Sequence, residues 1–181
     1  AEYHFVPRYL QHANEKPWPA LTQLNGLLVF DKSSLSVLNA TARFSMAPDI
    51  VVRDLSAHIP DLGKNIAVGI SASMQGPLEQ ALALTNQSPL AVITGDSLQH
   101  ATANGTADIQ LALGLPIMHM EKAIVKGAVT LQNNDVRITP DTPLLARARG
   151  AVDFSEKGFA LNAVQARMLG GDARLDGGMQ P

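Results

Sequence analysis

The sequence predicts a mainly-β protein, an antiparallel sheet of hairpins with one apolar face and one short α-helix. Three observations support this fold class. A hairpin pattern occurs three times, apolar and polar residues alternate along several other segments, and only one stretch has a helical period. The 181 residues suffice for one domain with a sizeable core. With 46% hydrophobic but only 4% aromatic residues, that core must be aliphatic.

The hairpin pattern is twelve residues long and covers residues 26–37, 127–138 and 150–161. Glycine opens each copy, apolar residues occupy the third and fifth places, and a polar tetrapeptide precedes apolar residues at the tenth and twelfth places. A four-residue loop would place all four apolar residues on one face of the sheet. The predicted cross-strand pairs are Phe30 with Leu35, Leu28 with Val37, Leu131 with Val136, Val129 with Ile138, Phe154 with Phe159, and Val152 with Leu161.

Alternation predicts further strands at 21–30, 35–44, 50–59, 66–74 and 106–115, and a strand region at 163–175 with a bend or bulge at Gly170-Gly171. The first 20 residues are irregular, and Trp18 is expected to lie extended against the sheet. No linker divides the chain. We therefore expect residues 1–181 to form a single β-rich segment, which begins and ends abruptly enough to belong to a larger protein.

The helical period occurs near residues 78–87. Pro77 suits the first helical position, and polar residues at 86–88 followed by Pro89 would end the helix. Its apolar stripe would consist of Leu78, Ala81, Leu82 and Thr85. We expect this helix to cover one end or flank of the apolar face.

Several classes of function find no support in the sequence. The net charge of −2 argues against nucleic acid as a partner, and the absence of cysteine excludes a thiol nucleophile and a zinc-thiolate site. The five histidines lack metal-ligand spacing, and no nucleophile-elbow, zinc-protease or phosphate-loop motif is present. No apolar run approaches the roughly 20 residues that span a bilayer. The sequence thus predicts a protein that is not an enzyme and has no cofactor and no metal.

Arg147 and Arg149 precede the third pattern and lie two residues apart, so one strand face would carry both. They could meet lipid phosphates or an acidic partner. An exposed polar strand face is the favoured interpretation.

The apolar face is the candidate binding site. One helix and few aromatic residues are too little to cover it, so an acyl chain could bury it instead. The candidate residues for this groove are Ile66, Val68, Ile70, Ile109, Leu111, Leu113, Val129, Leu131, Val152 and Phe154. Two alternatives stay open: a structural scaffold whose apolar face is filled by its own helix and loops, and a glycan-binding β-sandwich, which the scarcity of aromatic residues disfavours.

The order of several motifs resembles the middle of the YhdP-type proteins of the AsmA-like superfamily, from about Trp18 to Gly178. These motifs are Trp18-Pro-Ala-Leu, Gly26-Leu-Leu-Val-Phe-Asp, Leu35-Ser-Val, Gly76-Pro-Leu-Glu-Gln-Ala-Leu, Ser88-Pro-Leu, Gly105-Thr-Ala-Asp-Ile-Gln-Leu-Ala-Leu, Leu115-Pro-Ile, Gly127-Ala-Val-Thr-Leu and Leu169-Gly-Gly-Asp-Ala-Arg-Leu-Asp-Gly177. The resemblance implies a strongly curved antiparallel sheet, a groove or taco-like meander of hairpins with an apolar concave face.

The same resemblance implies a function and a location. It implies a periplasmic segment of a parent protein that is anchored in the inner membrane of a Gram-negative bacterium and carries phospholipid towards the outer membrane. The implied partners are phospholipid and the flanking repeats of the parent chain, with membrane contact only through parts of the parent outside this segment. The family has no catalytic residues to carry over.

Overall fold

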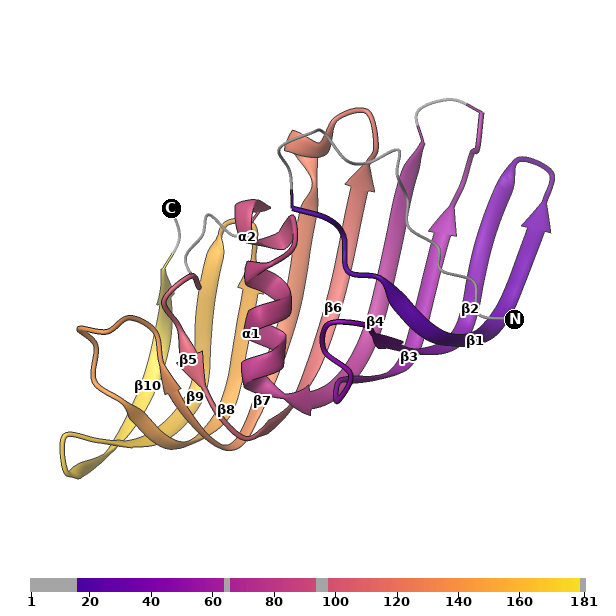
Figure 1. Ribbon diagram of the computed structural model, residues 1–181. Helices are drawn as coiled ribbons and strands as arrows, with labels where there is room; N and C mark the ends of the chain where they lie inside the picture. Colours follow the sequence, from indigo (N-terminus) through magenta and orange to yellow (C-terminus); the bar gives the residue numbers. More distant parts are fainter. Residues whose placement is uncertain (1–15, 64–65, 94–97, 180–181) are drawn as a thin grey trace.

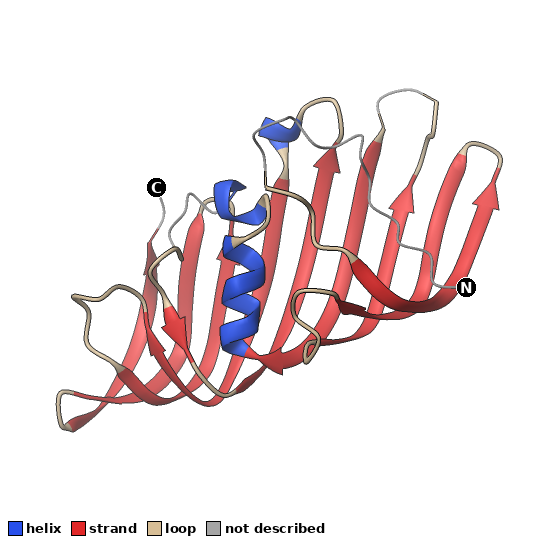
Figure 2. Ribbon diagram, in the orientation of Figure 1, coloured by secondary structure: helices blue, strands red, loops and turns tan. Residues whose placement is uncertain are grey.

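The computed structural model describes residues 16–63, 66–93 and 98–179, which form one curled antiparallel sheet of 10 strands (Figures 1 and 2). The strand order is β1-β2-β3-β4-β6-β7-β8-β9-β10, and the short β5 pairs with β7. The strands are β1 (Leu21–Asp31), β2 (Ser34–Phe44), β3 (Val51–Ile59), β4 (Ala67–Pro77), β5 (Thr102–Ala103), β6 (Thr106–Pro116), β7 (Ile124–Arg137), β8 (Leu145–Ser155), β9 (Gly158–Met168) and β10 (Gly171–Met179). The predicted fold class, a mainly-β curved antiparallel sheet with a short α-helix, is confirmed.

The first and third hairpin patterns are confirmed in their register. Phe30 lies opposite Leu35 in the first, and Phe154 lies opposite Phe159 in the third. The loops are shorter than expected, because Asp31 pairs with Ser34 and leaves a two-residue turn. In the first turn Lys32 has a positive φ angle of 52°. In the third pattern the positive φ angle, 134°, belongs to Gly158, which begins β9 directly after the two turn residues.

The second hairpin pattern is wrong, because β7 runs without a turn from Ile124 to Arg137. The polar stretch at its centre is a pair of register shifts, where the Asn134 side chain is 1% exposed. The Asn134 amide nitrogen donates to the carbonyl oxygens of Asn104 and Thr106, and its oxygen accepts from the Gln132 backbone N–H. These bonds hold the segment that leads into β6 against β7, so residues that read as a turn serve a tertiary contact instead.

The β8–β9 hairpin repeats the β1–β2 hairpin without insertion or deletion. Leu145 follows Leu21 by 124 residues, and the bounds of all four strands agree with that offset. The non-glycine residues with positive φ also correspond, at Gln23 and Arg147 in the first strand of each hairpin and at Asn39 and Ala163 in the second. Each of these residues lies at a register shift, which bends a strand and increases its twist. The repeated bulges therefore contribute to the curl of the sheet.

The predicted helix is present as α1 (Leu78–Asn86), with Pro77 as its N-cap, and is followed by the single turn α2 (Leu90–Ile93) and the 3-10 turn η2 (Met120–Lys122). Its buried residues are Leu78 and Leu84, while Leu82 is only half-buried. The helix lies over the middle of the strand order rather than at an end or flank (Figure 1). This position follows from the chain path, since β4, a central strand, leads directly into α1.

The predicted bend at Gly170-Gly171 is a hairpin turn. Met168 pairs with Gly171, and Leu169 and Gly170 form the turn with φ angles of 51° and 86°. The predicted region 163–175 therefore spans the end of β9 and most of β10.

Candidate functional site

The face of the sheet that carries α1, here called the apolar face, is built from aligned rows of apolar side chains. Cross-strand pairing connects these rows from β3 to β9. One row consists of Val52, Met74, Ile109, Val129, Val152 and Leu161, and the next consists of Leu55, Ala72, Leu111, Gly127, Phe154 and Phe159. Neither row contains a charged side chain.

The ten residues predicted from the sequence meet on this face. Nine lie in β4, β6, β7 and β8, while Ile66 directly precedes β4 and accepts a hydrogen bond from the Ile117 N–H. Val129 and Val152 are direct cross-strand partners. The buried members are Ile109, Leu113 and Leu131, at 7%, 8% and 5% exposure, and the other seven are half-buried. Contact with lipid stays a prediction for all ten.

The centre of the apolar face is covered by the chain itself. Leu84 packs with the cluster around Val52 and Ile109, and Leu78 packs with Leu131. The segment 16–20 crosses the same face on its way to β1 (Figure 1), and Trp18 packs with Leu90, Leu113 and Val125. The Lys16 Nζ donates a 2.8 Å hydrogen bond to the Asn86 carbonyl at the end of α1. The expectation for Trp18 therefore agrees with its position in the structure.

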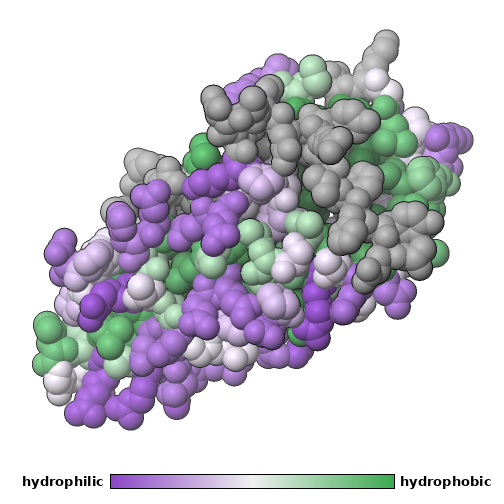
Figure 3. Space-filling view, in the orientation of Figure 1, coloured by the Kyte–Doolittle hydropathy of each residue, from purple (hydrophilic) through white to green (hydrophobic). Residues whose placement is uncertain are grey.

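The first hairpin leaves apolar surface uncovered. Leu28 and Phe30 face the same side as Val37 and Leu35, yet they are 55% and 67% exposed. Figure 3, which views the side that carries α1, shows hydrophobic surface at this end of the sheet. The candidate set did not include Leu28 and Phe30, although the hairpin pattern had already placed them on this face.

The side chain of Phe154, in β8, covers part of the neighbouring strand β7 on the apolar face. It pairs with Gly127, where a Cβ atom would overlap the Phe154 Cζ and lie 2.5 Å from the Gln110 carbonyl oxygen. The ring therefore lies over the glycine and joins the cluster that contains Leu113 and Val125. Glycine at this place of the pattern provides the room for an aromatic ring on the neighbouring strand.

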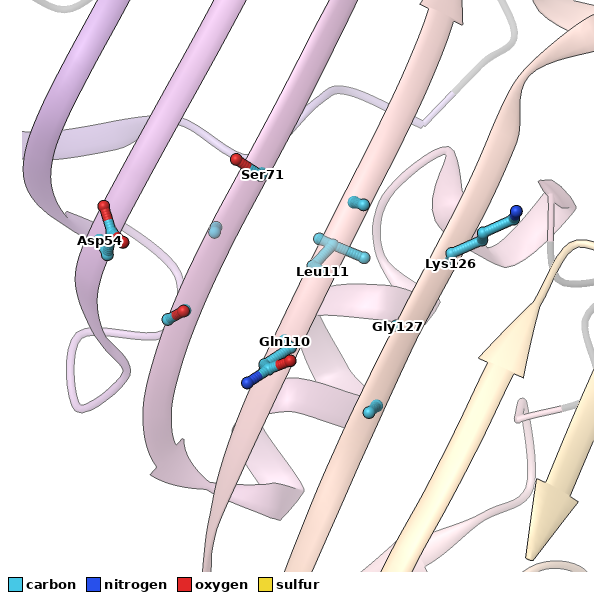
Figure 4. A pocket seen from close by; sticks show the side chains of 10 residues that line it. Asp54, Ser71, Gln110, Leu111, Lys126 and Gly127 are labelled. Carbon is cyan, nitrogen blue, oxygen red and sulfur yellow. The ribbon is translucent and has the colours of Figure 1, made fainter.

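The opposite face, here called the convex face, has a shallow hollow of about 460 Å³ (Figure 4). Figure 4 shows Asp54, Ser71, Gln110 and Lys126 on four neighbouring strands, with the helix behind the sheet. Small side chains, among them Ser71 and Ala112, explain the hollow. In its lining Ser73 lies opposite Asp54, but no hydrogen bond joins the two side chains. None of the described residues group into a cluster of three or more metal-ligating side chains.

Two carboxyl groups have a lowered pKa, and each accepts a hydrogen bond from a backbone N–H of the sheet. Hydrogen bonds from its own N–H and from that of Val125 lower the pKa of Glu156 in the β8–β9 turn. The Arg174 side chain and then the Ala163 N–H lower the pKa of Asp176. His58 and His119 are exposed and bond Ser36 and Glu121, His100 is exposed, and His4 and His12 lie outside the described residues.

The described residues define the class of open, curled antiparallel β-sheet proteins, with one continuous apolar face. The YhdP protein family model matches residues 2–181, and the chain belongs to that family. It is 29% identical over 147 residues to the intermembrane phospholipid transporter YhdP of Escherichia coli (strain K12). That match covers 81% of this chain but 11% of the relative, so the chain corresponds to a small part of such a protein. No solved structure matches.

None of the helices in the described part of the chain is long and apolar enough to cross a membrane.

Proposed function

We propose that the chain is one segment of an envelope-spanning lipid-transfer protein and holds phospholipid acyl chains on its apolar face between the inner and outer membranes. The observation that carries this proposal is the continuity of the face, whose aligned rows cross from β3 to β9 without a charge. The name of the E. coli relative supports phospholipid as the class of cargo.

The energetics favour such a face. An acyl chain gains about 0.8 kcal/mol per methylene on leaving water, so a sixteen-carbon chain exposed to water costs on the order of 12 kcal/mol. An aliphatic surface removes most of that cost, and exchange with a bilayer then becomes nearly neutral. The seven half-buried candidates retain surface that an acyl chain could cover.

The remaining parts of the proposal concern context. Residues 1–181 would be a single β-rich segment of a parent protein anchored in the inner membrane, located in the periplasm and flanked by further repeats. Membrane contact would occur only through those other parts. The segment itself would have no enzymatic activity, cofactor or nucleic-acid partner.

A scaffold in outer-membrane assembly that holds no lipid is the second candidate. One observation favours it: α1, α2 and residues 16–20 already cover the centre of the apolar face, whereas the hollow in Figure 4 lies on the convex face.

Two adjacent leucines provide a matched test of the lipid proposal. Leu27 and Leu28 are 59% and 55% exposed, and because side chains alternate along β1 they lie on opposite faces. Leu28→Asn should reduce the phospholipid that mass spectrometry detects in the purified chain, whereas Leu27→Asn should leave it unchanged. Equal lipid content in both variants, or no lipid in the parent chain, would favour the scaffold.

Leu111→Asn separates an open groove from a sealed core. Leu111 is half-buried between two core clusters. If acyl chains reach it, the variant should lose lipid more than stability, because the amide can still contact water. If the core is sealed there, an unpaired amide should cost about 1–3 kcal/mol in urea unfolding, with no change in bound lipid.

A further inference from the structure

The convex face carries a group of arginines over its last three strands, here called the arginine cluster. The cluster consists of Arg147, Arg149, Arg167 and Arg174. Arg149 and Arg174 are both cross-strand neighbours of Gln165 in β9. Arg167 lies in the next row opposite Asp172, and Arg147 lies at the β8 bulge.

These side chains point away from the apolar face. Ala148 and Ala166, which alternate with them along β8 and β9, are buried in the core cluster under α1. The sheet therefore lies between the arginine cluster and any acyl chain on the apolar face.

The cluster surrounds a shallow hollow of about 530 Å³. Asn133 and Gln165 add two amide groups to the lining, and Asp172 adds its only carboxylate. The lining thus contains four cationic side chains and one anionic side chain, although the whole chain carries a net charge of −2. Two further carboxylates lie beside the lining: Asp176 pairs with Arg174, and Asp135 accepts a hydrogen bond from the Arg147 N–H.

Most of this positive charge has no partner among the described residues. Arg174 bonds the Asp176 carboxylate through its Nε at 2.9 Å. The guanidinium groups of Arg147, Arg149 and Arg167 make no ion pair or hydrogen bond with any residue that the structure describes. All three are exposed, so a ligand could approach them from solvent.

We propose that the arginine cluster binds a phosphate group. The planar guanidinium donates paired hydrogen bonds that match phosphate oxygens, which is why arginine is preferred at such sites. Strands lie about 4.8 Å apart, so Arg149 and Arg174, two strands from each other, are close enough for their long side chains to reach one anion. A phosphate group carries up to two negative charges and three free oxygens, so it can accept hydrogen bonds from several guanidinium groups at once. A carboxylate has one charge and two oxygens and can satisfy fewer of them.

The phosphate could come from two sources, a soluble phosphate or the headgroup of an anionic lipid in a membrane surface. The second source would bring this segment itself into contact with a membrane, and binding to vesicles would therefore overturn the proposed restriction of membrane contact to other parts of the parent protein. The headgroup of a lipid held on the apolar face is excluded as the source, because the sheet separates the two sites. The proposal is therefore independent of the proposed lipid-transfer function, and either can fail alone.

The test measures binding of the intact chain to two probes at low ionic strength. Inorganic phosphate is titrated by NMR, and vesicles of phosphatidylglycerol are compared with vesicles of phosphatidylcholine by co-sedimentation. Arg149→Gln combined with Arg167→Gln should weaken binding of whichever probe binds by at least about tenfold. The reason is that each arginine removed donates charge-assisted hydrogen bonds to the phosphate, and these are stronger than hydrogen bonds between neutral groups. The signal should also fall as salt rises.

A matched control removes two other positive charges, Arg53→Gln with Lys126→Gln, from exposed positions at a distance from the hollow. This variant should bind within about twofold of the parent, because only nearby guanidinium groups contact the anion. Arg149→Lys with Arg167→Lys keeps the charge and should recover only part of the affinity, because lysine lacks the paired donors.

Three results would overturn the proposal. The first is that neither probe binds, and the second is that the control variant weakens binding as much as the arginine variant. The third is that polyglutamate competes as well as phosphate does, which would assign the cluster to an acidic polypeptide.

Discussion

The two repeated hairpins, β1–β2 and β8–β9, share their bounds, their register and their bulges but differ in burial. Phe30 is 67% exposed, whereas Phe154, at the same place 124 residues later, is half-buried. The difference lies in the neighbours. The β8–β9 hairpin has β7 on one side and β10 on the other, while the outer edge of β1 has no partner strand among the described residues. The sequence pattern determines the register of each hairpin, and the position of the hairpin in the sheet determines how much of its apolar surface is buried by neighbouring strands.

A single glycine makes the second environment possible. Gly127 of β7 provides the space in which the Phe154 ring lies, and no described strand offers such a space beside Phe30. The same local sequence pattern therefore occurs both in the exposed apolar surface of β1, around Leu28 and Phe30, and in the covered apolar surface of β8, around Phe154.

Gly127→Ala should have the largest effect, because the new Cβ would overlap Phe154 and press on the Gln110 carbonyl oxygen. We expect a loss of about 3–4 kcal/mol in the free energy of unfolding, measured by urea denaturation. Gly171→Ala is the control, since no atom lies within 4 Å of its Cβ position. Equal, small losses in both variants would mean that Phe154 does not lie over Gly127.

The equivalent glycines Gly26 and Gly150 should differ when each is replaced by alanine. Gly150 has φ of 129°, and a Cβ atom added there would lie 2.8 Å from the Ala163 carbonyl oxygen, so strain and overlap should together cost about 3 kcal/mol. A Cβ atom added to Gly26 would lie 2.5 Å from the Ala40 Cβ, but the outer edge of β1 has no partner among the described strands and can shift, so about 1 kcal/mol is expected. Thermal unfolding of both variants gives the comparison, and a larger loss for Gly26→Ala would reverse it.

Phe154→Ala should destabilise the chain by about 2 kcal/mol, because it empties a partly buried site. Phe30→Ala should cost less than about 0.5 kcal/mol, since most of that ring is already in water. If the exposed apolar surface around Leu28 and Phe30 holds acyl chains, Phe30→Ala should reduce the lipid content of the purified chain more than Phe154→Ala does. Urea unfolding and lipid mass spectrometry on both variants test this reversal, which similar values for the two would contradict.

The smallest effect concerns acid. The Asp176 carboxylate accepts from the Ala163 N–H at the β9 bulge, and its pKa is lowered from the ordinary 3.8, first by Arg174. A lowered folded pKa means that this contribution to stability is present above pH 3.8 and is lost as pH falls through the folded pKa. Asp176→Asn should therefore reduce the loss of stability on acidification, measured by the urea midpoint at neutral pH and near pH 3.

Asp141→Asn, in the loop between β7 and β8, is the control for that measurement. Its carboxylate makes no ion pair or hydrogen bond with any described residue, so this substitution removes a charge without removing such a contact. An unchanged acid dependence in the Asp176→Asn variant would show that the contacts of the Asp176 carboxylate with Arg174 and with the Ala163 N–H make no contribution to stability.

The sequence predicted two hairpins correctly because the residues that pair in each hairpin are close together in the chain. Alternation fixes which side chains share a face, so the pairs of Phe30 with Leu35 and of Phe154 with Phe159 followed from spacing alone. The same spacing failed at residues 127–138, since the side chain of Asn134 is recruited by the carbonyl oxygens of Asn104 and Thr106. That contact joins residues about 30 positions apart, and no local pattern reports it.

The helix shows the same division. Its span was predictable from its period and from Pro77, but the choice of Leu84 rather than Leu82 as a buried residue depends on where β4 delivers the chain onto the sheet. The ten candidate residues share a face because strand alternation is local. Their burial, from 5% exposure at Leu131 to half-buried at Phe154, depends on what α1 and Trp18 cover.

By itself, the sequence determined most of the strands, the sidedness of the sheet and the family resemblance, because each depends on residue spacing along the chain. The exception is β7, which runs without a turn where the spacing predicted a hairpin. Only the tertiary structure decided the strand order beyond the hairpins, the coverage of the apolar face by α1 and the meeting of four arginines from three strands. These features arise from contacts between residues far apart in sequence, where the free energy of packing and of charge placement depends on the whole fold.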